Sequence, residues 1–168
     1  ESVFDCPGYR DIADRRIHCI RRSGHGTLSL EESIAYSCNC AMMDIAGAEG
    51  AELFYKYQRD FGFGYKTGVD LPFESGASTL LYSADRLGPV ELATSSIGQS
   101  FNCTPIQALT AFSSIANGGQ IMRPYCVDSV IDGDGLTVFK NEPESIRTVM
   151  SEDTCAIMND YLLSVVDY

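Results

Sequence analysis

The sequence predicts an α+β fold, because its helical segments and its one β-hairpin are segregated along the chain. Capping signals and helical spacing mark helices between residues 29 and 119, a hairpin follows at 125–140, and a last helix begins after residue 151. The chain has 168 residues, of which 45% are apolar and 21% charged. This composition is typical of one ordinary globular domain.

The first helices are marked by their start signals. Ser29, followed three residues later by Glu32, is a capping box that predicts a short amphipathic helix with Leu30 and Ile34 on one face. Helical spacing continues over residues 39–50 until glycines intervene.

Helix and loop are both expected in the next stretch. Residues 50–62 predict a helix that buries Leu53, Phe54 and Tyr57. Gly, Pro, Asp and Ser are spaced through residues 62–89, which predicts a loop with little regular structure.

The strongest helical signal begins at Thr104, the predicted N-cap. Pro105 occupies the first helical position and Gln107 completes a capping box. Gly118 and Gly119 are expected to end the helix, since they accept a left-handed backbone. The apolar stripe expected to face the core consists of Ile106, Leu109, Phe112 and Ile115.

The C-terminal part predicts a hairpin followed by a helix. Two β-rich runs flank Asp132-Gly133-Asp134-Gly135, which predicts the hairpin at 125–140. Ser151 is the predicted N-cap of the closing helix. The side chains expected to face inward are Met158, Tyr161, Leu162 and Val165.

Charge and hydropathy restrict the partners of the chain. A net charge of −11 argues against a nucleic-acid partner, because phosphate binding needs a basic surface. The one basic run, Arg15, Arg16, Arg21 and Arg22, is better explained by a solvated face than by a polyanion site. No apolar run approaches the roughly 20 residues that span a bilayer, and no signal-peptide pattern opens the sequence.

Cysteines are frequent and their number is odd. The seven are Cys6, Cys19, Cys38, Cys40, Cys103, Cys126 and Cys155, without a Cys-x-x-Cys pair. Cys38 and Cys40, with His18, Cys19 and His25 nearby, are an alternative metal-ligand set. Buried thiols that act as small apolar side chains are the simpler interpretation, so we predict no metal site and no cofactor.

Three blocks of this sequence resemble consecutive blocks of class B penicillin-binding proteins, in particular septation and sporulation transpeptidases of Gram-positive anaerobes. The blocks are LSLEESIAYSCNCAMMDIA (28–46), FGFGYKTGVDLPFE (61–74) and SSIGQSFNCTPIQALTAFSSIANGGQIMRPY (95–125). The resemblance implies a β-lactamase/transpeptidase-like fold and a partial transpeptidase domain over 1–168. Residues 27–119 would be mainly its helical subdomain, and 120–168 the hairpin and closing helix of an incomplete antiparallel sheet.

The resemblance also implies a reaction and its partners. In the family a Ser-x-x-Lys serine attacks a D-Ala carbonyl of the peptidoglycan stem peptide and forms an acyl-enzyme, and β-lactams acylate the same serine. A Ser-x-Asn motif relays a proton, and a Lys-Thr-Gly strand aligns the substrate. The parent protein would be anchored at the extracytoplasmic face of the bacterial membrane, beside a division-type glycan polymerase, and would need no cofactor.

Ser37-Cys38-Asn39 matches the Ser-x-Asn motif, and its flanks place it in a turn between two helices, as in the family. Ser37 and Asn39 are therefore the expected catalytic residues. Ser100-Phe101-Asn102 matches the same tripeptide, but it falls in the loop before the long helix, where turn and cap roles suffice.

The other two motifs are expected to lie outside this chain. None of its three lysines, Lys56, Lys66 and Lys140, has a serine three residues earlier. Lys66-Thr67-Gly68 precedes the long helix in a turn-rich loop, whereas the family's catalytic triplet follows the closing helix. We therefore expect an internal piece of a D,D-transpeptidase domain that is inactive by itself, with Phe73 where this block usually has Gly.

Two other functions are weighed against this one. A serine β-lactamase usually carries Ser-Asp-Asn and Glu-x-x-Leu-Asn, but position 38 is Cys and the second motif does not occur. A non-catalytic helical binding or interaction module is the alternative from a different class.

Two further expectations concern the cysteines and the surface. Cys19 and Cys38 would form a redox pair if their Cα atoms lie within roughly 7 Å, although unpaired thiols are the simpler state. The closing helix and the free edge of the 125–140 hairpin predict self-association of the chain.

Overall fold

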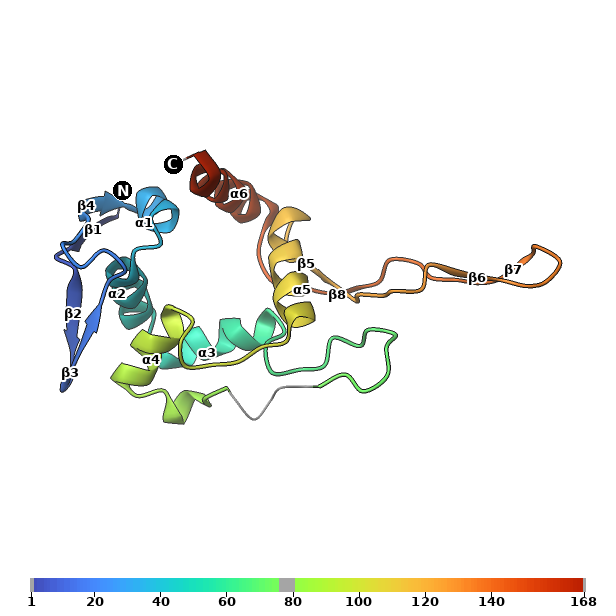
Figure 1. The fold of residues 1–168 in the computed structure, drawn as a ribbon, viewed down its shortest axis with the longest axis horizontal. Coiled ribbons are helices and arrows are strands. Elements are labelled where there is room, and N and C mark those ends of the chain that lie inside the picture. The colour runs from blue at the N-terminus through green and yellow to red at the C-terminus, as the bar shows by residue number, and fades with distance from the viewer. Residues whose placement is uncertain (1, 76–80, 168) are drawn as a thin grey trace.

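The computed structural model describes residues 2–75 and 81–167. Helices follow one another around an open arc that brings the last helix, α6 (Glu152–Asp167), back to the first, α1 (Leu30–Ala35) (Figure 1). Helices and antiparallel strand pairs together confirm the α+β class. Among the helices in the described ranges, none has both the length and the apolar character needed to cross a bilayer.

Four short strands form the N-terminal part of the arc. Strand β1 (Val3–Cys6) pairs antiparallel with β4 (Gly26–Ser29), and β2 (Tyr9–Ile12) pairs antiparallel with β3 (Arg15–His18). The sequence analysis predicts none of these strands. Four-residue strands that carry several Arg and Asp side chains show too little apolar alternation to be recognised.

The first three helices lie where the sequence predicts helices. The Ser29 Oγ accepts the Glu32 N–H at 3.1 Å and the Glu32 carboxylate accepts the Ser29 N–H at 2.8 Å, which confirms the capping box of α1. Helix α2 (Asn39–Glu49) follows after a short turn, and α3 (Ala51–Asp60) follows α2 directly.

The described residues between 62 and 89 are largely irregular, as predicted, and include the 3₁₀ turn η2 (Ala84–Arg86). Residues 76–80 of this predicted loop lie outside the described residues. Two helices follow, α4 (Pro89–Ser96) and α5 (Pro105–Ala116). The Thr104–Gln107 capping box of α5 is present in both directions, which confirms that prediction.

The C-terminal strands form two separate pairs. Strand β5 (Gln120–Met122) pairs with β8 (Ser145–Thr148), and between them the hairpin of β6 (Ser129–Ile131) and β7 (Thr137–Lys140) projects away from the helices (Figure 1). Gly119 joins α5 to β5 at φ +95°, and a Cβ there would lie 2.1 Å from the Met150 carbonyl oxygen. Glycine is therefore required for the close approach of these two segments.

The predicted buried faces of two helices are wrong in part. On α3, Leu53 and Tyr57 are exposed while Gln58 is buried. On α5, Leu109 and Phe112 are exposed, and the buried side is the one that carries Ala111 and Ser114. Small side chains allow α6 to approach closely, so the packing partner and not the apolar stripe decides which face is covered.

The inward face of α6 is confirmed only in part. Ser151 caps the helix, since its Oγ accepts the Thr154 N–H at 3.2 Å. Met158, Tyr161 and Leu162 are half-buried, whereas Val165 is exposed. The buried contact with α5 is made by Cys155, whose thiol lies 3.9 Å from the Ser114 carbonyl oxygen, and by Asn159, which donates to the Ile115 carbonyl.

Phe73 has a left-handed backbone, with φ +64°, and its side chain is fully exposed. We predict that Phe73→Gly raises the free energy of unfolding by about 1 kcal/mol, because glycine relieves the left-handed strain and little packing is lost. Denaturant unfolding measures this change. Phe73→Ala is the control, since it removes the ring but keeps the Cβ, and equal stability of the Gly and Ala variants would contradict the strain argument.

Candidate functional site

The candidate catalytic residues Ser37 and Asn39 lie at the turn between α1 and α2. The Ser37 N–H donates to the Ile34 carbonyl at 3.0 Å, and the Cys38 N–H donates to the Ser33 carbonyl at 2.9 Å. Ser37 has φ +50°, a conformation that costs energy for any residue except glycine. The turn is therefore closely defined by its backbone, and Asn39 is the first residue of α2.

The two side chains differ in their surroundings. The Ser37 side chain is exposed, so its hydroxyl is accessible from solvent. The Asn39 amide nitrogen donates to the His18 carbonyl oxygen at 3.1 Å, which ties α2 to the last residue of β3. An amide has two N–H donors and a carbonyl acceptor, so Asn39 keeps one donor and its acceptor for another partner.

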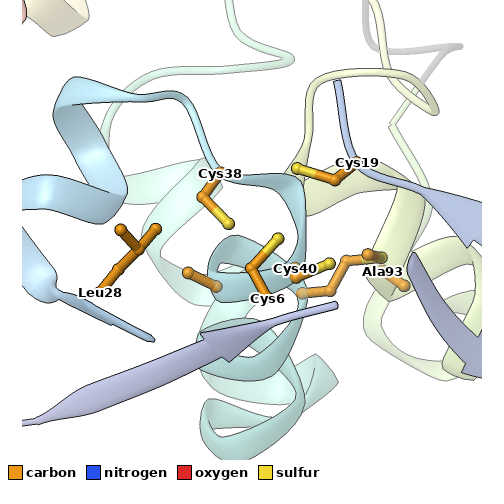
Figure 2. Packing of buried hydrophobic residues seen from close by; sticks show 8 residues of the cluster. Cys6, Cys19, Leu28, Cys38, Cys40 and Ala93 are labelled. Carbon is orange, nitrogen blue, oxygen red and sulfur yellow. The ribbon is translucent and has the colours of Figure 1, made fainter. Parts of the chain in front are cut away.

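Between these two residues, Cys38 points the other way, into the protein. Its side chain is completely buried and belongs to a core cluster with Cys6, Cys19 and Cys40. Figure 2 shows these four side chains gathered near the N-terminus of α2, with Leu28 and Ala93 beside them. The motif thus alternates between accessible side chains and a buried one.

The thiols in this cluster have different acidities. Burial raises the pKa of the Cys38 thiol to about 12 and also raises the pKa of Cys40. Burial acts in the same direction on Cys6, but hydrogen bonds from the backbone and ring of His25 outweigh it and lower the pKa of Cys6 to about 6. Of Cys6, Cys38 and Cys40, Cys6 is therefore the thiol most readily ionised.

His25 brings a ring nitrogen to the edge of the cluster. Its Nδ1 lies 3.5 Å from the Cys6 Sγ and 3.6 Å from the Cys19 Sγ. The imidazole stacks on the Tyr36 ring, with centroids 5.8 Å apart and an interplanar angle of 10°. The ligand atoms of Cys6, Cys19, His25 and Cys38 all lie within 4.8 Å of one another.

This set differs from the alternative metal set of the sequence analysis. It contains Cys19, His25 and Cys38, but Cys6 takes part in place of Cys40 and His18. Cys6 was missed because only the unpredicted pairing of β1 with β4 brings it to the turn. Cys19 and Cys38 have free thiols in this structure, so their disulfide stays a prediction.

The two motif-like triplets elsewhere have structural partners. The Glu74 carboxylate accepts the Thr67 N–H and hydroxyl at 2.6 and 2.7 Å and the Gly68 N–H at 3.0 Å, within a loop. The Ser100 hydroxyl pairs with the Thr94 hydroxyl at 2.5 Å. Both observations agree with turn roles for Lys66-Thr67-Gly68 and Ser100-Phe101-Asn102.

The comparisons with known proteins all point to the same kind of domain. The family model described as the penicillin binding protein transpeptidase domain matches residues 1–168. Stage V sporulation protein D of Bacillus subtilis is 38% identical over 160 residues, which are 95% of this chain and 24% of that protein. This chain therefore spans about a quarter of the length of that relative.

Solved structures show the same similarity. The D,D-transpeptidase domain of a peptidoglycan glycosyltransferase from Eggerthella lenta has a TM-score of 0.86 and 27% identity, over 99% of this chain and 43% of that one. Penicillin-binding protein 3 of Mycobacterium tuberculosis, in complex with aztreonam, has a TM-score of 0.85 and 27% identity, over 99% of this chain and 36% of that one. These matches confirm the predicted transpeptidase-like fold.

One ion pair fastens the N-terminal strands to the helix that begins at the motif. Arg10 on β2 donates to both carboxylate oxygens of Asp44 on α2, at 2.8 and 2.6 Å. Its Nη2 also donates to the Asp5 carbonyl at 2.5 Å. The hydrogen bonds to Asp44 raise the pKa of Arg10, so its guanidinium stays charged at neutral pH.

We predict that Asp44→Ala lowers the free energy of unfolding by about 1–2 kcal/mol, because it leaves the partly buried Arg10 without its bidentate partner. Asp11→Ala is the matched control: it removes the similar but more exposed pair with Arg16, and it should cost less stability than Asp44→Ala because solvent screens an exposed pair. Urea unfolding of both variants checks the difference. Equal losses would show that the Arg10 pair does not fasten the strands.

Proposed function

Because the chain belongs to the penicillin-binding protein transpeptidase family, we propose that it supplies the Ser-x-Asn side of a peptidoglycan D,D-transpeptidase active site. The observation that carries this proposal is the turn at Ser37-Cys38-Asn39, which leaves the Ser37 hydroxyl accessible and fixes Asn39 through His18. In the proposed enzyme the attacking serine and the catalytic Lys-Thr-Gly come from parts of the parent protein that this sequence does not contain.

The two side chains have separate roles in the proposed acyl transfer. The Ser37 hydroxyl accepts a proton from the attacking side and donates one to the leaving amine, which a hydroxyl can do without a net change of charge. The free donor and acceptor of the Asn39 amide pair with the carbonyl and N–H of the stem peptide. Since the other Asn39 donor is held by the His18 carbonyl, the amide is oriented before the substrate binds.

The same site accounts for the proposed partners. A β-lactam presents an acyl group and an amide like those of the D-Ala-D-Ala terminus, so it would use the same contacts and acylate the same serine. The parent protein would act at the extracytoplasmic face of the bacterial membrane, where peptidoglycan is made, beside a division-type glycan polymerase.

We predict that this chain forms no covalent adduct with penicillin, because no Ser-x-x-Lys occurs in its sequence. Incubation with a fluorescent penicillin, followed by a denaturing gel, tests this. A labelled band that maps to any serine of the chain would contradict the assignment of the nucleophile to another part of the parent protein.

In the parent protein, Ser37→Ala and Asn39→Ala should each lower the rate of acylation by about 10²-fold or more, the usual loss for a group that moves or orients a proton. Ser100→Ala is the control, because it changes the other Ser-x-Asn tripeptide and should leave the rate unchanged. Stopped-flow labelling measures the rates. If Ser37→Ala acylated as fast as the unchanged protein, the proposed role of the turn would be wrong.

The surface of the C-terminal part supports self-association with a second copy of this chain. In the described part of the chain, β6 and β7 pair only with each other, so each has an open edge. Their apolar side chains Ile131, Val138 and Phe139 are exposed, as are Leu163 and Val166 on α6. Open edges and exposed apolar faces of this kind recruit another chain.

We therefore expect concentration-dependent dimers or larger species in light scattering, and faster hydrogen exchange in residues 120–168 than in 27–119. A Val138→Lys/Leu163→Lys double variant should shift the chain toward the monomer, because charges on an exposed strand oppose pairing. Ile20→Lys is the control, because it changes a side chain that is even more exposed and lies far from both sites in the sequence. A strictly monomeric chain with uniform protection through residue 167 would contradict this expectation.

A further inference from the structure

We propose that Cys6, Cys19, His25 and Cys38 bind one Zn²⁺ ion directly behind the Ser37–Asn39 turn. Three thiols and one imidazole are a donor set that structural zinc sites use. Their ligand atoms converge within 4.8 Å, although the four residues come from three segments of the chain: Cys6 ends β1, Cys19 and His25 lie between β3 and β4, and Cys38 precedes α2. The proposal extends beyond the transpeptidase role and does not depend on it.

The distances suit a tetrahedral ion. With Zn–S near 2.3 Å and Zn–N near 2.0–2.1 Å, tetrahedral angles put a sulfur and a nitrogen ligand about 3.6 Å apart and two sulfurs about 3.8 Å apart. The two sulfur-to-Nδ1 distances are 3.5 and 3.6 Å. With no ligand pair farther apart than 4.8 Å, side-chain adjustments smaller than the length of a bond complete the tetrahedron.

The surroundings favour a closed, structural site. Cys6, Cys19 and Cys38 are 1%, 3% and 0% exposed, so water has little access to their sulfurs. His25 is half-buried, presents Nδ1 to the sulfurs, and has its ring held against Tyr36. Four protein ligands fill a tetrahedral shell, which leaves no open position for chemistry at the metal.

The backbone brings the ligands together through two interlocked turns. Gly8 has φ +98°, and a Cβ there would lie 2.1 Å from the Arg22 carbonyl oxygen. Gly24 has φ +83°, and a Cβ there would lie 2.3 Å from the Cys6 carbonyl oxygen. The Cys19 N–H donates to the Gly8 carbonyl at 2.9 Å. Only glycines permit this approach, which sets Cys6 beside Cys19 and His25.

The ion would help to hold the candidate active site in place, because two of its ligands lie next to the residues of that site. Cys38 stands between Ser37 and Asn39, and Cys19 follows His18, whose carbonyl accepts the Asn39 amide. A Zn²⁺ bound to both cysteines would join the backbone of the motif to the segment that orients its asparagine. The four ligands are thus positioning residues for Ser37 and Asn39.

A disulfide between Cys19 and Cys38 is the main competing state. It would use two of the three sulfurs and leave Cys6 and His25 without a role, whereas the zinc site uses all four groups. The same two sulfurs cannot form a disulfide and bind the metal at once, so the two states differ in thiol count and in metal content.

The test measures metal in this chain, purified with reductant and without added metal. Elemental analysis should find one Zn²⁺ per chain. Exchange for Co²⁺ should give thiolate-to-cobalt charge-transfer and tetrahedral d–d absorption. X-ray absorption at the zinc edge should find three sulfurs at about 2.3 Å and one nitrogen, a result that needs no variant.

The variants assign the ligands. Cys6→Ser and Cys38→Ser should each lose the bound equivalent or most of the charge-transfer band. Cys155→Ser, which changes a buried thiol outside the cluster, and Cys40→Ala, which changes the neighbouring buried thiol, should keep both. Melting temperature should fall when a chelator removes the metal from the unchanged chain but not from Cys6→Ser.

Three outcomes would overturn the proposal. They are a reduced chain that binds neither Zn²⁺ nor Co²⁺, a Cys19–Cys38 disulfide found by peptide mapping of the natively purified chain, and retention of the full metal complement by Cys6→Ser and Cys38→Ser. Because none of these readouts involves penicillin, failure of the zinc site is distinguishable from failure of the transpeptidase role.

Discussion

At the N-terminus of α2, the side chain of Cys38 must point into the core while those of its two neighbours, Ser37 and Asn39, point away from it. The rest of the site depends on that constraint. Cys38 is completely buried, while Ser37 before it is exposed and Asn39 after it reaches the His18 carbonyl. Burial of Cys38 fixes the turn from behind, because rotating Ser37 or Asn39 away would pull the thiol out of the core. The positive φ of Ser37 persists because the surrounding contacts over-determine it.

Two attachments hold the N-terminal strands against that helix. One is the cluster around Cys6, Cys19 and Cys38, and the other is the bidentate pair of Arg10 with Asp44. They act at different depths, since the thiols are buried and the ion pair is partly solvated. Strands as short as β1 to β4 would be marginal without them, because a two-stranded pair rarely supports itself in water.

The sequence predicted correctly those features that depend only on residues close together in the chain. Both capping boxes, at Ser29 and Thr104, formed as expected because each is complete within four residues. The strand pairing of residues 3–29 was missed, because these strands are stabilised by the burial of their cysteines against α2, a contact between residues far apart in the sequence. The prediction that Leu109 and Phe112 are buried was wrong for the same reason: α5 packs through the face that carries its small side chains. The position of Ser37 and Asn39 was predicted from their flanks, but the convergence of Cys6 and His25 on the same turn was not.

Three short motifs in this chain differ in what their side chains are free to do. Thr67 of the Lys-Thr-Gly triplet gives its hydroxyl to Glu74, and Ser100 of the second Ser-x-Asn tripeptide pairs with Thr94. Ser37 has an exposed hydroxyl on a backbone that is fixed by buried neighbours. A proton relay needs a group that is both accessible and held in place. A mobile side chain is not oriented toward the substrate, and a side chain that is hydrogen-bonded within the protein is not available to it. Only the turn at Ser37 meets both conditions among these three motifs.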